Sequence, residues 1–124
     1  MKTTLSDLKN TVRENVCEIV FVRRRPRPNR PALRRMICTL DPNILNSTNG
    51  RLSLNYKPSS NILPYNAEGK GLLPVWDIFM QDWRMVSTEN CDIVSTIKEE
   101  DFWNYFNDTL LPMTPSQKMA YMDS

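Results

Sequence analysis

The chain has 124 residues, of which 40% are hydrophobic and 24% are charged, and its net charge is +2. This composition is typical of a globular protein, and we expect a single domain over residues 1–124. No apolar run approaches the roughly 18 residues of a membrane-spanning helix, and the first residues lack the apolar region of a secretory signal. We therefore expect a cytoplasmic protein with no membrane partner.

Histidine is absent, and the cysteines number three, at Cys17, Cys38 and Cys91. Without histidine the usual catalytic triads and Cys–His nucleophiles cannot form, and the chain has no glycine-rich phosphate-binding motif. No C-x-x-C pair is present, so zinc lacks its usual ligands. We expect no enzymatic activity, no metal and no cofactor, and we interpret the three cysteines as buried reduced thiols.

The first predicted element is an amphipathic helix over residues 5–14, because Leu5, Leu8 and Val12 have helical spacing and Thr4 is a suitable N-cap. The β-branched and aromatic residues of Val16–Arg24 then predict a strand. This strand has apolar residues on both faces, which indicates an interior place in a sheet. Residues 33–40 predict a second strand, which we expect to form a hairpin with the first.

The arginine segment, residues 23–35, joins these two strands and contains seven arginines, three prolines and no acid. Its prolines predict an extended, solvated loop. Arginine carries a planar fork of donors that binds phosphate or carboxylate in two places, which lysine does not. All seven arginines are therefore the candidate binding residues: Arg23, Arg24, Arg25, Arg27, Arg30, Arg34 and Arg35.

Four roles remain open for the arginine segment. It would bind the phosphates of nucleic acid, bind the acidic surface of a protein partner, keep a sheet edge soluble, or pair internally with acids near the C-terminus. From Glu89 onward the chain has seven acids against two lysines, so the charge asymmetry suits either a partner or an internal pairing.

A single helical turn is expected at residues 41–45, followed by an insertion over residues 46–71 that is rich in Asn, Ser, Gly and Pro and is expected to be mobile. Strands are expected at 72–80, 83–87 and 91–97, with the first two forming a hairpin.

The predicted strands at 72–80 and 83–87 each carry a tryptophan, Trp76 and Trp83. Core packing is the favoured role of both, and a stacking platform for bases is the alternative. We also expect Asp77 and Arg84 to form a cross-strand charge pair.

The last strong pattern predicts a helix over residues 98–111, with Thr96 and Glu99 as a capping box and Pro112 as its end. One further helical turn is expected after Thr114. This C-terminal segment is rich in aromatic residues and methionine, so we expect it to pack on the sheet, or else to present a surface to a partner.

Two stretches of the chain are RMICTLDPNIL and LPVWDIFMQDWRMVSTENCDIVSTI. Both resemble a family of small tailed-phage proteins with an Sm-like, SH3-like barrel related to the WYL-type barrels. The shared residues are Arg35, Met36, Cys38, Thr39, Leu40, Asp41, Pro42, Val75, Trp76, Asp77, Trp83, Arg84, Ile93 and Ile97. The resemblance covers residues 16–97 without the insertion. It implies a barrel fold, and no functional residues, because the family has no settled biochemical function.

Together these patterns predict a mainly β (α+β) protein, with a small five-stranded Sm/SH3-like barrel at about 16–97, an N-terminal helix and a C-terminal helix at about 98–111. The functional hypothesis is a non-catalytic phage accessory protein in the host cytoplasm, which binds nucleic acid through the phosphate backbone. The alternative is an interaction module that docks on a host protein and inhibits or redirects it. The sequence does not separate RNA from DNA or define an oligomeric state.

Overall fold

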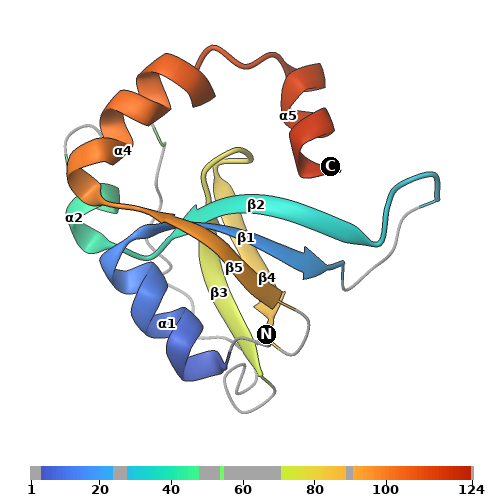
Figure 1. Cartoon of the computed structure of the whole chain (residues 1–124), viewed down its shortest axis with the longest axis horizontal. Coiled ribbons are helices and arrows are strands. Elements are labelled where there is room, and N and C mark those ends of the chain that lie inside the picture. The colour runs from blue at the N-terminus through green and yellow to red at the C-terminus, as the bar shows by residue number, and fades with distance from the viewer. Residues whose placement is uncertain (1–3, 24–27, 48–53, 55–70, 89–90, 124) are drawn as a thin grey trace.

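The computed structural model describes residues 4–23, 28–47, 54, 71–88 and 91–123 (Figure 1). These residues form an α+β fold in which one five-stranded antiparallel sheet is covered by helices. The predicted insertion at 46–71 lies almost wholly outside the described residues, as do Arg24, Arg25 and Arg27.

The N-terminal helix α1 (Leu5–Glu14) is present with the predicted limits. Thr4 caps it, because its hydroxyl accepts a hydrogen bond from the amide of Asp7 at 3.1 Å. Leu8 and Val12, one turn apart on the same face, are fully buried against the sheet.

All five predicted strands are present in the described chain: β1 (Val16–Val22), β2 (Leu33–Thr39), β3 (Leu72–Asp77), β4 (Asp82–Ser87) and β5 (Cys91–Ile97). Their order in the sheet is β4-β3-β2-β1-β5. The interior position predicted for the first strand is confirmed, since β1 pairs with β2 on one side and with β5 on the other.

The sheet is curved (Figure 1) but is not closed in the described residues. Ser87 ends β4 and Cys91 begins β5 four Cα steps later, which is at most about 15 Å. The two edges of a flat five-stranded sheet would lie about 19 Å apart, so the edges are drawn toward each other. No pairing joins β4 to β5 among the described strands, so the predicted closed barrel is not confirmed, whereas the five-stranded antiparallel sheet is.

The two faces of the sheet bury two separate cores. On one face, α1 packs against Ile19, Met36 and Val75. On the other face lie α4 (Glu99–Tyr105) and the π-helical turn η3 (Phe106–Leu110), with α5 (Pro115–Met122) alongside β2 (Figure 1). Buried residues of this second core are Val16, Ile37, Ile44, Leu45, Leu54, Trp76, Ile78, Phe79, Phe102, Phe106 and Leu110. Two of them come from α2 (Pro42–Leu45), the predicted turn.

The C-terminal segment departs from its prediction at two helix starts. The expected Thr96–Glu99 capping box is wrong, because β5 extends through Ile97, and Thr96 stays in the strand opposite Cys17; α4 begins after Lys98 without a side-chain cap. The single turn expected after Thr114 is a helix of eight residues, α5, with a complete capping box between Thr114 and Gln117.

The three cysteines lie together in the core beneath α1. Cys17 and Cys38 are cross-strand partners, Cys91 belongs to the same core cluster, and all three are buried free thiols, as predicted. Burial raises the pKa of Cys17 to about 12 and that of Cys91 to about 11, and it raises the pKa of Cys38 well above its usual value.

We expect all three thiols to be unreactive toward 5,5′-dithiobis(2-nitrobenzoate) at pH 8 in the folded protein. Both access and the small thiolate fraction limit the reaction. In 6 M guanidinium the same assay should count three thiols per chain. A thiol that reacts within seconds under native conditions would contradict the packing of this core.

Candidate functional site

The described part of the arginine segment lies at the loop end of the β1–β2 hairpin. Arg23 directly follows β1, Arg30 lies in the turn before β2, and Arg34 and Arg35 belong to β2 itself. Asn29 has a φ of 64° and so turns the chain back toward β2.

Arg23 and Arg30 converge on one carboxylate that the sequence patterns did not single out. The terminal nitrogens of Arg23 and Arg30 donate to the same oxygen, Oδ1 of Asp123, at 2.6 and 2.7 Å. Asp123 directly follows α5, so this contact joins the C-terminal end of the described chain to the hairpin. The two guanidinium groups hold the pKa of Asp123 below its usual value, with the hydrogen bond from Arg30 as the largest cause.

Arg34, predicted as a binding residue, is instead part of the core. Its side chain is 10% exposed and forms an ion pair with Asp77, which is fully buried. The same guanidinium lies over the ring of Phe21 and contacts the sulfur of Met122 at 3.3 Å. Arg34 is therefore a structural residue.

The expected pairing of Asp77 with Arg84 is wrong. The register of the β3–β4 hairpin places Asp77 opposite Asp82, and Arg84 opposite Val75. Arg84 pairs with Asp82 at 3.1 Å on the surface. The second carboxylate oxygen of Asp77 accepts the backbone amides of the turn that follows β3.

Arg35 also has a partner within the fold. It donates to Glu18 of β1 at 2.8 Å. Burial, followed by Glu18, raises the pKa of Tyr121. Arg35 therefore links β2 to β1 within the sheet.

Internal pairing is thus the arrangement found for the four arginines of the segment that the structure describes, which meet three carboxylates, of Asp123, Asp77 and Glu18. One of the three, Asp123, belongs to the acidic C-terminal region counted in the sequence. Because Arg23 and Arg30 share a single carboxylate, this pair of arginines keeps an excess positive charge.

The two tryptophans occupy the predicted cross-strand position. Trp76 and Trp83 are register partners, and their rings meet edge to face at 5.6 Å and 85°. Trp76 is 1% exposed, which excludes it as a platform for a base, while Trp83 is half-buried at the edge of the same core. Core packing is therefore the role observed for Trp76.

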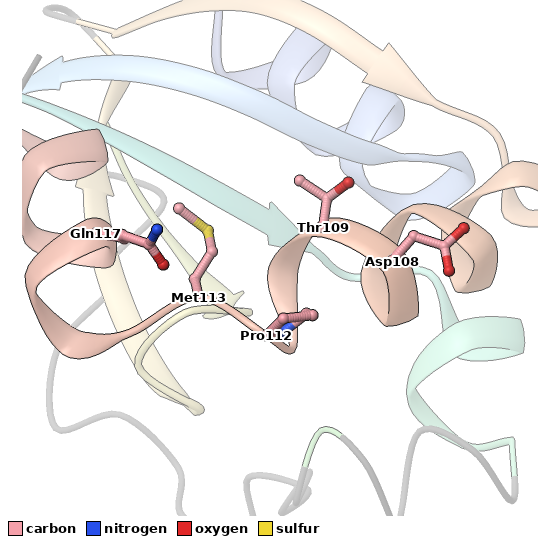
Figure 2. A pocket seen from close by; sticks show the side chains of 5 residues that line it. All are labelled: Asp108, Thr109, Pro112, Met113 and Gln117. Atoms are coloured by element: carbon pink, nitrogen blue, oxygen red, sulfur yellow. The ribbon is translucent and has the colours of Figure 1, made fainter.

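An open hollow of about 400 Å³ lies between the end of η3 and the start of α5. Figure 2 shows Asp108 and Thr109 on one side, with Pro112, Met113 and Gln117 on the other. The hollow contains none of the arginines, so it is separate from the Arg23–Asp123–Arg30 cluster.

Neither a metal centre nor a membrane span is found in the described parts of the chain. No three residues of the ligating types stand together there, and no helix there has the length and apolarity needed to cross a bilayer. In comparisons with known proteins, no family model, no curated protein and no solved structure matches this chain.

We expect Asp77→Asn to lower the free energy of unfolding by about 3 kcal/mol, because it leaves the Arg34 charge buried without a counter-charge. Asparagine retains an oxygen for the backbone amides that Asp77 accepts, so the loss reports mainly on the ion pair. The measurement is urea denaturation followed by tryptophan fluorescence.

Asp82→Asn is the matched control, because it removes the same charge from the surface pair with Arg84, whose side chains are 33% and 65% exposed. The expected loss is less than about 1 kcal/mol. Equal losses for the two variants would contradict the buried role of Asp77.

Proposed function

We propose that this protein is a non-catalytic module that binds nucleic acid through its phosphate backbone, with the arginine segment as the contact surface. The observation that carries the proposal is the convergence of Arg23 and Arg30 on a single oxyanion. Two guanidinium groups around one oxygen are equally suited to a phosphate oxygen, with which arginine forms charge-assisted hydrogen bonds.

The proposed contact residues are fewer than the seven arginines of the sequence prediction. Arg34 and Arg35 hold the fold together, which leaves Arg23 and Arg30 at the base and Arg24, Arg25 and Arg27 between them in the chain. With Trp76 buried, direct reading of bases has little support, and we propose binding with weak sequence dependence to RNA or DNA.

We also propose a barrel fold and a phage accessory role for this protein. The strand order β4-β3-β2-β1-β5 and the curvature of the sheet support an Sm/SH3-like barrel, and the motif resemblance supports a phage accessory protein in the host cytoplasm. A barrel in this proposal presents the β1–β2 hairpin beyond the packed core, which suits a backbone contact.

A second candidate is a protein-interaction module, and the hollow beside α5 favours it. Its rim carries Met113, and the nearby Leu111 and Met119 are 56% and 49% exposed. Methionine is common at surfaces that adapt to a protein partner. In this candidate the partner is a host protein that is inhibited or redirected.

We expect the protein to bind fluorescent oligonucleotides with an affinity that falls steeply as salt rises. For duplex DNA each lost phosphate contact reduces the slope of log K against log salt by roughly 0.9. Replacing Arg25 and Arg27 by alanine should therefore flatten the slope by up to about 1.8, measured by fluorescence anisotropy from 50 to 300 mM KCl.

The control replaces Arg13 and Lys98, which are exposed on other elements, by alanine. This variant has the same net charge but should retain most of the salt slope. Lysine at positions 25 and 27 should preserve much of the binding, because point charges also neutralise phosphates. No binding at 50 mM KCl would reject the nucleic-acid proposal and favour the protein-interaction candidate.

A further inference from the structure

The guanidinium of Arg23 is positioned by the hairpin itself. Its Nε donates to the carbonyl of Pro31 at 2.9 Å, and the Arg23 backbone amide donates to the carbonyl of Ala32 at 2.8 Å. Asp123 is therefore not required to orient this arginine. The backbone of Pro31 and Ala32 thus orients one of the two arginines that bind the anion.

The cluster has more donor groups than Asp123 satisfies. The Nε group of Arg30 is buried and has no hydrogen-bond acceptor among the described residues. Asp123 receives both arginines on one oxygen, whereas a phosphate presents several acceptor oxygens. The donor arrangement thus suits a larger oxyanion than the carboxylate that occupies it.

The positive charges gathered around Arg23 also require a neighbouring anion. Burial and the neighbouring positive charges of Arg30 and Arg34 lower the pKa of Arg23, while Asp123 raises it. Removing Asp123 without a replacement would leave Arg23, at 12% side-chain exposure, close to two other cations.

Helix α5 is attached to the protein mainly by its last turn. None of its residues is fully buried. Its contacts run through Tyr121, which packs on Phe79 at 4.9 Å, through Met122 on Arg34, and through Asp123 on the arginines. Its N-terminal capping box lies between Thr114 and Gln117, so α5 is capped independently of the sheet.

From these observations we propose that α5 and Asp123 form a C-terminal latch, in which the Asp123 carboxylate occupies the position of a nucleic-acid phosphate between Arg23 and Arg30. Binding of nucleic acid displaces the latch. This inference rests on the proposed function, and it adds that the unbound protein carries an intramolecular competitor for its own site.

If the latch exists, inorganic phosphate and nucleic acid should displace Asp123 at different concentrations. Asp123 competes from within the same chain, at an effective concentration of the order of millimolar. A single inorganic phosphate replaces one anion by another and should displace the latch only at comparable or higher concentration. A nucleic acid presents many linked phosphates to Arg23 and Arg30, so it should displace the latch at a far lower concentration than inorganic phosphate does.

The experiment measures latch position and affinity on the full chain. The 13C-methyl NMR signal of Met122 reports on the latch, and that of Met36, buried in the opposite core, serves as the internal reference. In the wild type, a single-stranded oligonucleotide should shift the Met122 signal toward the value of an unpacked methionine and leave Met36 unchanged. Inorganic phosphate should do so only at millimolar levels, and KCl at equal ionic strength should not.

Asp123→Asn should shift the Met122 signal in the absence of any ligand. If the latch is docked for about nine-tenths of the time, this variant binds the oligonucleotide about tenfold more tightly. The control Glu14→Gln removes the same charge from the exposed C-terminal end of α1. This position precedes β1, whereas the hairpin loop with the arginines follows β1. The control variant should tighten binding only slightly and leave Met122 in place.

The outcomes separate the two proposals. Saturation by the oligonucleotide with an unchanged Met122 signal overturns the latch and leaves nucleic-acid binding intact. Equal affinities for Asp123→Asn and Glu14→Gln also overturn it. Displacement of Met122 by inorganic phosphate, without oligonucleotide binding, supports the phosphate site and rejects nucleic acid as its ligand.

Discussion

The buried ion pair of Arg34 and Asp77 is the interaction on which the architecture depends. The ladder between β2 and β3 consists of only two residue pairs, Cys38 with Asp77 and Thr39 with Trp76. β3 ends at Asp77, and just beyond it the amide of Ile78 still donates to the carbonyl of Ile37 at 2.9 Å. From four residues along β2, Arg34 reaches back to the carboxylate of Asp77. The same guanidinium contacts Phe21 of β1 and Met122 of α5, so one side chain connects three strands and the last helix.

The placement of Arg34 also determines what the arginine segment is able to do. Its two C-terminal arginines, Arg34 and Arg35, are paired within the folded core and its border. The segment therefore begins and ends on a rigid base, while its excess charge lies toward the turn. A rigid base lowers the ordering cost of binding, and it also brings Asp123 within reach of the same donors.

Much of the fold follows from local patterns in the sequence. Helix α1 and the five strands are readable from helical spacing, from β-branched runs and from the prolines between them. Thr4 illustrates why, because its cap depends on a residue only three positions away. Whether the sheet closes was not predictable in this way, since closure depends on pairing between β4 and β5, which no local pattern records and which is not found among the described strands.

The site was less predictable than the fold, because its determining contacts join distant residues. Arg23 and Asp123 are 100 positions apart, and Arg34 and Asp77 are 43 apart. Asp123 was visible only as one of the seven acids of the C-terminal region. Arg34 is followed by another arginine and has no local sign of burial, apart from the alternation that places it on one face with Met36 and Cys38.

The position of β1 between β2 and β5 has a consequence for synthesis of the chain. Its partners in β5 lie between 70 positions away, for Phe21 with Cys91, and 81 positions away, for Val16 with Ile97. At roughly 5 to 20 residues per second, a ribosome takes on the order of 4 to 16 s to add that length. During this interval one edge of an apolar strand has no partner, and such an edge is prone to pair with other chains. Early docking of α1, which precedes β1 in the chain, would shield Ile19 and Phe21 while that edge waits.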